Sequence, residues 1–561
     1  MRKLRENLSK WYHKSLMLLV CCTVMSVSAG AVRHPIVVVR PMDACASGER
    51  VYAEALSKHV VRWLREGGVA ADLADDRSLE QTLAGRRFAY LVMCQNPHAY
   101  QLGAIKRFLA RGGRICAFYS TSQELASLMG VRLGTYKKAG PGGFEKIAFV
   151  ARGPAGSPSA IAQSSSAIFS AYPIAKRSAV LAEWMDGAGR RTGEPAILST
   201  SVGWWVTHVF LAEGDEQAKM RFLLSMSGAM VPGSWNAQAW LQREQVRRKQ
   251  IVEYARRQRK RPGELHAVWD HSGQGLYPGD WPRTIRLLAA NGITDLFVNV
   301  AGAGFAHYPT RCLPTSNICR TRGDQLAQCL AAAKGTGIRV HAWVLCFNGT
   351  RSVGGQMGVF TKNGWRLKNR KGVLTEYLNP SKPDLQSYML AAIEDVARRY
   401  PVAGVHLDFV RWYEGAQKPQ NAASVITGFV SSARRRVKSV RPGAWLTAAV
   451  LATYPSCVTS VGQDWEKWIA AGMIDYIVPM NYVEDNTKYA SLVARQGRTP
   501  VQARRVISGL GVTANESRLG PIKVIDQINL ARRAGLAGVA FFDLDHTLAV
   551  EILPYLRMGM F

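Results

Sequence analysis

The sequence has 561 residues, 47% hydrophobic and 20% charged, which excludes a disordered, collagen-like or coiled-coil chain because enough apolar side chains are present for packed cores. Length alone predicts about two to four domains, although a single (β/α)8 barrel takes up about 250 residues. The 72 Lys and Arg residues exceed the 40 Asp and Glu residues by 32 charges, which favours anionic partners such as an envelope, a nucleic acid or an acidic glycan.

Residues 1–31 have the pattern of a secretory signal peptide. Basic residues from Arg2 to Lys14 precede an apolar run from Leu16 to Val27, and small residues follow. The run is shorter than the about 20 residues that a membrane-spanning helix needs. An uncleaved anchor and a lipoprotein attached through Cys21 are less favoured alternatives. We therefore expect a secreted or periplasmic protein with no transmembrane segment in its mature chain.

The cysteines give little sign of chemistry. Four of the ten lie within apolar patterns and are predicted to be core residues. Cys312 and Cys319 flank a loop containing Pro314 and are the only candidates for a local disulfide. The sequence has no CxxC pair and no HExxH motif, so we predict no metal site and no cofactor.

Residues 32–235 form a first predicted domain, in which strands and helices alternate. This alternation indicates a parallel sheet covered on both faces. The Gly-, Ser-, Ala- and Pro-rich middle, 137–200, gives no clear elements. The predicted strands are 36–39, 69–73, 88–93, 114–119 and Trp205 to Leu211, and the predicted helices are 49–66, about 98–111 and a last one ending at Met230.

The turn after the 114–119 strand reads Phe118-Tyr119-Ser120-Thr121-Ser122. The domain resembles the class I glutamine-amidotransferase-like domains, which share a flavodoxin-like sheet. Those enzymes need a Cys at a sharp strand-to-helix elbow and a His-Glu pair, but here Cys116 lies within the strand. A nucleophilic Ser120 or Ser122 would need a base that no recognisable spacing supplies. We therefore predict a non-catalytic accessory domain, which glutaminase activity of the isolated 32–235 fragment would contradict.

Residues 236–262 are predicted to form a basic helix that links two domains. A solvated linker is the ordinary interpretation of such a charge run. The alternative is a cationic strip that holds the protein on an anionic envelope polymer. We do not expect nucleic acid as a partner, because no reading motif is present. The helix carries Arg243, Arg247, Arg248, Lys249, Arg256, Arg257, Arg259, Lys260 and Arg261.

Residues 263–561 repeat a strand–helix unit eight times, which is the arithmetic of a TIM (β/α)8 barrel. In such barrels the chemistry collects at the C-terminal ends of the strands. Strand-like runs start near Leu265, Asp295, Ile338, Val402, Trp445, Asp475, Arg505 and Ala537. The helical patterns that follow include 281–291, 323–336, 383–399, 421–440 and 521–534.

The predicted strand ends carry the residue types of a saccharide site. Flat aromatic rings cover the apolar faces of sugars, amides and carboxylates bind hydroxyls, and hydrolysis needs two carboxyl groups across the scissile bond. We expect a pocket at the barrel mouth lined by Trp269, Asn299, Trp343, Asp408, Trp412 and Tyr482. The candidate substrate-binding residues are Trp269, His271, Asn299, His341, Trp343, His406, Arg411, Trp412, Asn481 and Tyr482.

Asp408 is the strongest catalytic candidate, because it ends an otherwise apolar strand. Its structural alternative is an ion pair with Arg411. For the second carboxylate we rank Glu484 first, Asp270 second and Asp543 third. We expect desolvation to raise the pKa of Glu484, making it the general acid, while Asp408 stays ionised as nucleophile or base. A solvated loop position for Glu484 and a hydrogen-bond acceptor role for Asp270 are the alternatives.

The barrel resembles the glycosyl hydrolase-like 10 family of bacterial envelope and secreted proteins, which is distinct from the family 10 xylanases. The resemblance implies cleavage of amino-sugar-containing glycans, including peptidoglycan strands. It is carried by NVAGAGFAHYPT (299–310), RVHAWVLCFN (339–348), YLNPSKPD (377–384), GVHLDFVRW (404–412) and DYIVPMNY (475–482).

Two positions depart from the pattern of this family. Phe409 stands where many relatives carry a second acidic residue, and Asn481 stands in place of a common Gln. Our main hypothesis is therefore an exported glycoside hydrolase acting on a polysaccharide or peptidoglycan-type glycan. The alternative is a non-catalytic glycan-binding or envelope-scaffold protein built on a degenerate barrel.

Overall fold

The computed structural model describes residues 33–140, 143–210 and 215–561, so the predicted signal peptide lies outside the described residues. The chain divides into two compact units, Met1–Arg243 and Glu244–Phe561. Among the described residues, no helix has the length and apolar character that crossing a bilayer requires.

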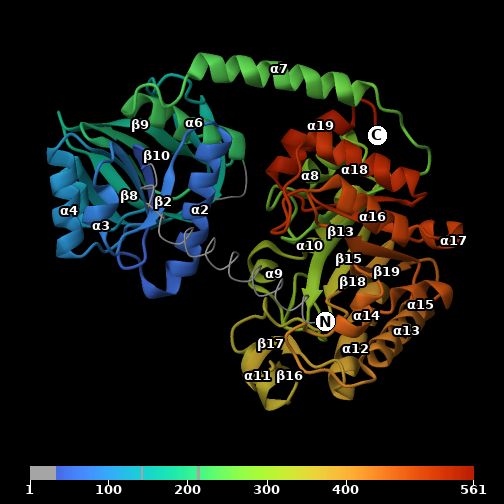
Figure 1. The fold of residues 1–561 in the computed structure, drawn as a ribbon. Coiled ribbons are helices and arrows are strands. Elements are labelled where there is room, and N and C mark those ends of the chain that lie inside the picture. The colour runs from blue at the N-terminus through green and yellow to red at the C-terminus, as the bar shows by residue number, and fades with distance from the viewer. Residues whose placement is uncertain (1–32, 141–142, 211–214) are drawn as a thin grey trace, which may run out of the picture. The chain divides into compact units, whose positions relative to one another are not determined.

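The described part of the first unit is built on a nine-stranded sheet with the order β2-β1-β3-β4-β11-β10-β9-β6-β7 (Figure 1). The five strands from β2 to β11 run parallel, in the order of flavodoxin-like sheets. The predicted parallel α/β domain is therefore confirmed. These strands are β1 (Ile36–Arg40), β2 (Asp72–Asp75), β3 (Phe88–Val92), β4 (Arg114–Phe118) and β11 (Gly203–Val206).

Helices cover both faces of this sheet, because successive side chains of a strand point to opposite sides. Val38 packs into a core with α2 and α6, whereas its neighbour Val37 packs with α3, α4 and α5. The helices are α2 (Arg50–Glu66), α3 (Leu79–Leu83), α4 (Ala99–Ala110), α5 (Gln123–Met129) and α6 (Glu216–Met230).

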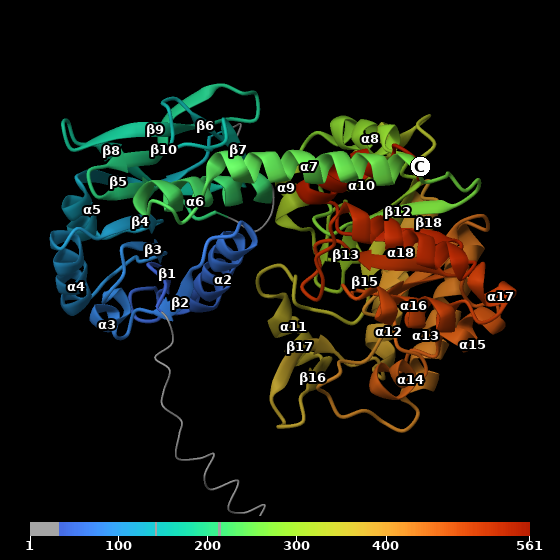
Figure 2. The same cartoon turned by 45° about the horizontal axis from the view of Figure 1, so that its top comes forward.

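Antiparallel strands extend the sheet through the region where the sequence predicts no elements (Figure 2). Many of their side chains are small or polar, and one strand reads Ala-Ile-Ala-Gln-Ser-Ser, so the two-residue hydrophobic period is weak. β5 and β8 form a separate two-stranded ladder. The added strands are β5 (Val131–Lys138), β6 (Phe144–Phe149), β7 (Ala160–Ser165), β8 (Ala167–Pro173), β9 (Ser178–Met185) and β10 (Arg191–Thr200).

Two predicted boundaries are wrong. The strand expected from Trp205 to Leu211 ends at Val206, and Leu211 itself lies outside the described residues. The basic helix, α7 (Ala237–Arg256), ends six residues before the expected 262. The residues that follow α7 contact the barrel, because the Arg261 guanidinium donates a hydrogen bond to the carbonyl of Leu536 at 3.0 Å.

The second unit is a closed barrel of eight parallel strands, as predicted. The sheet closes because β12 pairs with both β13 and β22, and all eight predicted strand starts fall within about two residues of an observed strand. The strands are β12 (Leu265–Asp270), β13 (Asp295–Gly302), β15 (Arg339–Leu345), β18 (Gly404–Asp408), β19 (Trp445–Leu451), β20 (Tyr476–Met480), β21 (Ile507–Gly511) and β22 (Gly538–Phe542).

Helices surround the barrel and follow the predicted strand–helix alternation (Figure 1). The longer ones are α8 (Trp281–Ala290), α10 (Gln325–Ala333), α12 (Pro383–Arg399), α13 (Ala422–Val440), α16 (Asn486–Gln496) and α18 (Pro521–Arg533). Shorter elements in the loops are β14 (Phe305–Ala306), α9 (Asn317–Arg322), α11 (Gln356–Lys362), β16 (Arg366–Lys368), β17 (Leu374–Leu378), α14 (Ser456–Val461), α15 (Trp465–Ala470), α17 (Pro500–Ala503) and α19 (Leu553–Leu556).

Each barrel strand divides its side chains between two cores. Trp269 and Trp343 point inward and belong to one core inside the barrel. Val268 and Val344, next to them in the chain, point outward and pack against the helices. This alternation fixes which residues reach the interior, so the inward side chains at the carboxyl ends of the strands form the barrel mouth.

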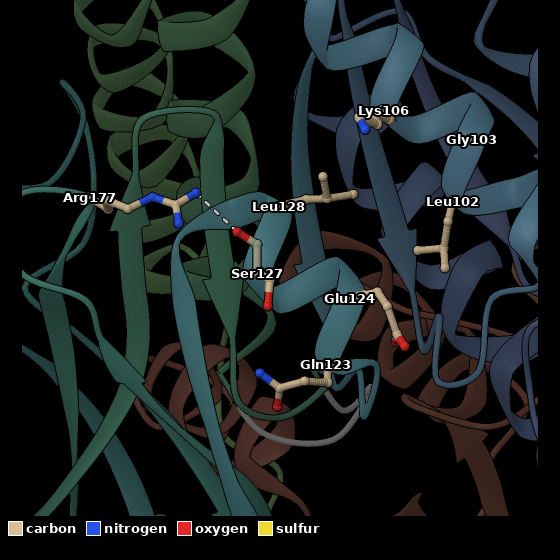
Figure 3. A pocket seen from close by; sticks show the side chains of 8 residues that line it. All are labelled: Leu102, Gly103, Lys106, Gln123, Glu124, Ser127, Leu128 and Arg177. Carbon is tan, nitrogen blue, oxygen red and sulfur yellow. Dashed lines mark hydrogen bonds between the residues drawn. The ribbon is translucent and has the colours of Figure 1, made fainter.

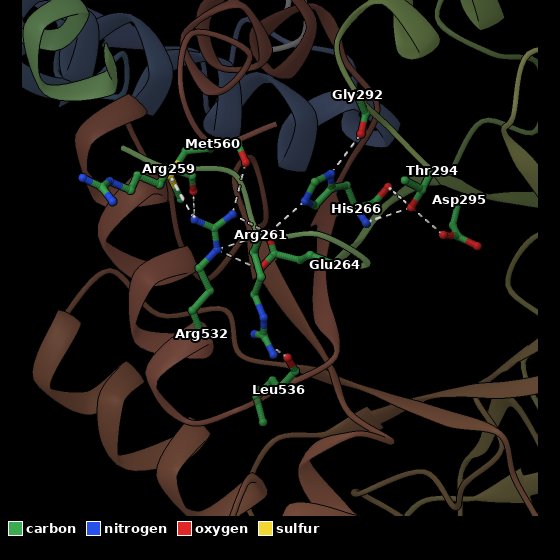
Figure 4. A network of polar contacts seen from close by, with 10 residues as sticks. All are labelled: Arg259, Arg261, Glu264, His266, Gly292, Thr294, Asp295, Arg532, Leu536 and Met560. Carbon is green, nitrogen blue, oxygen red and sulfur yellow. Dashed lines mark hydrogen bonds and ion pairs between the residues drawn. The ribbon is translucent and has the colours of Figure 1, made fainter. Parts of the chain in front are cut away.

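A buried ion network ties the two ends of the barrel unit's chain together (Figure 4). The Glu264 carboxylate accepts hydrogen bonds from Arg532 Nε at 2.8 Å and from His266 Nε2 at 2.9 Å. Arg532 also donates to the carbonyl of Met560 at 3.1 Å, and the ring of Phe561 stacks on His266 with centroids 3.6 Å apart. The network therefore joins the start of β12, helix α18 and the last residues of the chain.

Replacing Glu264 by Gln should lower the free energy of unfolding by about 3 kcal/mol, because it leaves the buried Arg532 guanidinium without its counter-ion. Urea unfolding followed by near-UV circular dichroism measures the loss. Glu253→Gln is the matched control, since the exposed Glu253 of α7 pairs with the exposed Arg257 just beyond the helix, and this change should cost less than about 1 kcal/mol. Equal losses in the two variants would contradict the assignment.

Candidate active site

Asp408 is the last residue of β18 and its side chain points into the barrel mouth. The preceding inward residue of the strand is His406, and Asp408 lies level with Leu345 of the neighbouring β15. Only 6% of Asp408 is exposed. The location that the sequence predicted for this carboxyl group, at the C-terminal end of the barrel, is therefore the observed one.

Three groups converge on the Asp408 carboxylate. The Phe409 amide donates to Oδ1 at 2.6 Å, and Trp343 Nε1 donates to Oδ2 at 3.3 Å. Arg411 Nη1 lies 3.6 Å from Oδ1, an ion-pair distance longer than a good hydrogen bond. Phe409 has φ 47°, a left-handed conformation that is costly for a bulky residue and that turns the chain sharply after Asp408.

Burial raises the pKa of Asp408 above its ordinary value, although the Arg411 charge, the Phe409 amide and Trp343 oppose the shift. Desolvation outweighs the Arg411 cation 3.6 Å away, so the direction of the shift opposes the expectation that Arg411 keeps Asp408 readily ionised. A raised pKa favours the protonated form of a carboxyl group, which is the form that can deliver a proton.

Aromatic rings line one side of the mouth. The ring of His271 lies 5.8 Å from Trp343 and 5.9 Å from Phe542, and Phe542 stacks on Tyr482 at 5.4 Å. Burial and the Arg351 charge lower the pKa of His271 to about 4, so this imidazole is neutral near pH 7. Together the rings offer apolar faces next to Asp408.

A second aromatic group, which the sequence analysis missed, continues from Asp408 in another direction. Phe409 lies 6.1 Å from Tyr377 of the β16–β17 hairpin, and Tyr377 stacks flat on Tyr413 with centroids 4.3 Å apart. We call Phe409, Tyr377 and Tyr413 the tyrosine platform. The sequence could have indicated both tyrosines, because Tyr377 begins the YLNPSKPD segment and Tyr413 directly follows GVHLDFVRW.

Tyr482 lies among acidic residues from three strand ends. Burial raises the pKa of its phenol well above the ordinary value, and the charges of Asp408, Glu516 and Asp543 add to the shift. Thr513 Oγ1 donates to Asp543 Oδ1 at 3.1 Å and so orients that carboxylate. Glu516 lies in the loop after β21 and was missed by the sequence analysis, which examined no residue of that loop.

The first- and second-ranked partners of Asp408 have other environments. Glu484 is exposed, and its carboxylate accepts a hydrogen bond from the Arg518 amide at 2.9 Å, so the desolvation expected for it is absent. Asp270 is fully buried and accepts hydrogen bonds from Ser272 Oγ at 2.6 Å and from the Gly275 amide at 2.8 Å. Asp270 thereby fixes the loop after β12.

Three predicted binding residues lie away from the mouth. Trp412 packs in the outer core and donates to the carbonyl of Ala422 at 3.3 Å. Asn481 donates to Gln496 of α16 at 2.9 Å, behind the barrel wall. His341 points inward but lies near the opposite end, where its Nε2 donates to Asp295 at 2.8 Å. These placements correct the prediction that all three reach substrate.

Two other predicted binding residues, Trp269 and His406, lie below the mouth, inside the barrel. Trp269 Nε1 donates to His406 Nε2 at 2.9 Å, and His406 Nδ1 lies 2.8 Å from Thr447 Oγ1. Because Nε2 accepts, the proton of the neutral ring is on Nδ1. Burial lowers the pKa of His406 well below its ordinary value, which keeps it in this form. Trp269 and His406 therefore support the residues above them.

The buried polar atoms that make no hydrogen bond among the described residues include Arg411 Nη1, whose contact with Asp408 is an ion pair at 3.6 Å, and Asn299 Oδ1. Asn299 is inward-facing on β13, level with Trp343, and its Nδ2 donates to the carbonyl of His271 at 3.3 Å. Since buried polar groups are nearly always hydrogen-bonded, these two atoms are suited to a ligand's hydroxyl groups.

The two serines at the elbow of the first unit make no hydrogen bond to a histidine among the described residues. Ser120 Oγ donates to the carbonyl of Cys94. Ser122 Oγ donates to the Glu124 carboxylate at 3.3 Å and accepts from the Leu125 amide as the cap of α5. Tyr119 occupies the turn itself with φ 48°, and its ring lies 5.1 Å from His208. A shallow pocket of about 570 Å³ lies elsewhere on this unit, between α4 and α5 (Figure 3).

The described cysteines carry free thiols, Cys312 and Cys319 included, so the candidate local disulfide is not formed. Within the same residues, His, Cys, Asp and Glu form no group of three or more that is arranged to hold a metal ion.

Residues 278–425 match the model of the family described as Glycosyl hydrolase-like 10. The Glycosyl hydrolase DigH of Escherichia coli K12 is 24% identical over 243 residues, which cover 34% of this chain and 55% of that protein. The protein of the same name in Shigella flexneri gives the same values. The chain thus spans about half the length of the curated relatives it matches, and residues 278–425 carry a glycosyl hydrolase-like domain that includes Asp408.

The solved structures that are similar to the chain include the following two. The PgaB (BpsB) glycoside hydrolase domain from Bordetella bronchiseptica gives a TM-score of 0.42 at 14% identity, covering 54% of this chain and 100% of that one. A class V chitinase from Pseudomonas fluorescens Pf-5 gives a TM-score of 0.36 at 12% identity, covering 53% of this chain and 99% of that one.

Replacing Arg411 by Gln should raise the pKa of Asp408 further, because the guanidinium is the group that most opposes the effect of burial. Carbon-13 NMR of aspartate-labelled protein measures this pKa, with the Asp408→Asn variant assigning the resonance. Arg435→Gln, an exposed change on α13, is the charge-matched control and should leave the titration unmoved. An unchanged or lowered pKa in the Arg411 variant would refute the account.

Proposed function

We propose that the protein is an exported glycoside hydrolase that cleaves a polysaccharide or peptidoglycan-type glycan at the barrel mouth. The observation that carries the proposal is the buried, inward-facing Asp408, whose pKa is raised among aromatic walls. Sugar rings stack on such walls, and a protonated carboxyl group can protonate the glycosidic oxygen. The glycosyl hydrolase-like match over 278–425 and the DigH relatives support the reaction class.

In this mechanism Asp408 is the general acid. Its proton passes to the oxygen of the leaving sugar as the glycosidic bond breaks, and Arg411 then stabilises the carboxylate that forms. Trp343 fixes the orientation of the carboxyl group through its hydrogen bond to Oδ2. The unpartnered Asn299 Oδ1 accepts a hydrogen bond from a sugar hydroxyl.

The second carboxylate is proposed to be Asp543, with Glu516 as the alternative. The charges of both residues raise the pKa of the Tyr482 phenol, and so does the charge of Asp408. Asp543 directly follows β22 and is oriented by Thr513, whereas Glu516 is exposed in the loop after β21. The partner acts on the opposite face of the sugar ring, either as nucleophile or as the base that activates water.

The remaining parts of the chain complete this proposal. Residues 1–31 are removed as the signal peptide on export, and 263–561 form the catalytic barrel. Residues 32–235 act as an amidotransferase-like accessory domain without chemistry of its own, which their elbow supports because neither serine hydroxyl is hydrogen-bonded to a histidine in the described part of the chain. The basic linker, 236–262, binds an anionic envelope polymer through the arginines and lysines exposed along α7.

A glycan-binding scaffold on a degenerate barrel is the second candidate. The observation that favours it is Phe409, an apolar residue at the position where many relatives of the resembled family carry a second acid. In the scaffold, Asp408 and the aromatic walls would bind the glycan without cleaving it.

Asp408→Asn should reduce the release of reducing ends from amino-sugar glycans by about 10²–10⁴-fold, because an amide cannot supply the proton. Circular dichroism checks that the variant folds. Glu484→Gln is the matched control and should retain near wild-type turnover, since its carboxylate is exposed and bound to the Arg518 amide. Glycan binding by all three proteins with turnover by none would favour the scaffold.

The pH profile separates the two carboxyl groups. Wild-type turnover should fall as the pH rises through the raised pKa of Asp408, because only its protonated form is active. Asp543→Asn should cut turnover by about 10²-fold or more and remove the acidic limb, whereas Glu516→Gln should leave that limb in place. If Glu516→Gln removes the acidic limb and Asp543→Asn leaves it in place, Glu516 is the second carboxylate.

A further inference from the structure

A pocket of about 620 Å³ opens next to the loop that follows β18. Its wall is formed by that loop, the first turn of α13, helix α14 and the turn of the β16–β17 hairpin. Among its lining residues the charged side chains are Arg370 and Lys418, both cations, and the amides of Gln417 and Gln420 lie beside them.

Both cationic residues are hydrogen-bonded to the backbone of the loop that follows β18. The amide of Arg370 donates to the carbonyl of Gly415 at 3.1 Å, and Lys418 Nζ lies 3.3 Å from the carbonyl of Ala416. Burial and then the Arg370 charge lower the pKa of Lys418, while Glu414 opposes the shift. The Arg370 and Lys418 side chains therefore repel each other, and an anion placed between them would relieve this repulsion.

The pocket also faces the start of α13. Ala422 and Ala423, the first residues of this 19-residue helix, are part of the lining, and the cap residue Asn421 makes no side-chain hydrogen bond to the first turn. The positive end of the helix dipole therefore acts in the same direction as the two cations.

The tyrosine platform connects this pocket with Asp408. Tyr413 belongs to the same loop as Lys418, and Gly415 folds so close to the Tyr413 ring that an added Cβ would lie 2.7 Å from it. The loop thus runs from Asp408 past the stacked Tyr377 and Tyr413 to the two cations. The loop that follows Asp408 therefore carries both Tyr413 and the lysine of the pocket.

We propose that this pocket binds the acid group, a carboxylate or a phosphate, of a sugar unit remote from the cleaved bond, so that the preferred glycan is polyanionic. The proposal rests on the proposed function, since it adds a subsite to the same glycan-binding surface. It identifies an acidic substrate class that the aromatic walls around Asp408 do not specify.

Equilibrium binding to the full chain tests the proposal, with Asp408→Asn present throughout so that no ligand is cleaved. The probes are a uronic-acid-containing hexasaccharide, the same sugar with its carboxylates reduced to alcohols, and the reduced sugar carrying phosphate esters. At low ionic strength we expect an acidic probe to bind about tenfold more tightly than the neutral one. Whether the carboxylate or the phosphate probe binds better identifies the acid group.

Arg370→Gln combined with Lys418→Gln should abolish this preference. Arg286→Gln combined with Lys334→Gln removes the same charge from exposed positions outside the pocket and should preserve it. Equal affinity for acidic and neutral probes, equal loss in the two double variants, or no binding of any probe would overturn the proposal. Failure of the proposed function is seen separately, as absence of wild-type turnover, because the binding preference needs no catalysis.

Discussion

The pairing of β12 with both β13 and β22 is the constraint on which the barrel unit depends. Because this pairing closes a sheet of parallel strands, every strand delivers its carboxyl end to the same mouth. Residues far apart in the chain, Trp343, Asp408, Tyr482 and Phe542, therefore meet around one opening. The Glu264–Arg532 network stabilises the opposite end of β12, away from the mouth.

The environment of Asp408 shows how the barrel interior sets its chemistry. The layer below it, Trp269 hydrogen-bonded to a neutral His406, is apolar and offers no counter-charge, so burial dominates the pKa of the carboxyl group. Arg411 moderates the effect from 3.6 Å without cancelling it. The ring of Phe409 packs under the Arg411 guanidinium, whose carbon lies 4.2 Å from the ring centroid, and helps to hold that cation beside Asp408.

The barrel could be predicted from sequence because each strand is a short apolar run followed by a helical pattern, and Asp408 because it ends such a run. Side-chain direction was harder to predict. Asn481 follows the inward-facing Met480 and must point outward by strand alternation, which the prediction overlooked. Trp412 lies beyond the end of β18, where no alternation applies. The charges that meet at Tyr482 come from separate loops, so only the fold brings them together.

The free thiols have a consequence for a protein that is exported as proposed. Oxidation requires a thiolate that a reagent can reach. Burial raises the pKa of Cys116, Cys329 and Cys346 well above the ordinary value, so these thiols stay protonated inside packed cores. Of the described cysteines only Cys312 is partly exposed. In an oxidising compartment, packing would thus shield every described thiol except that of Cys312, so the other thiols would be open to oxidation only before the chain folds.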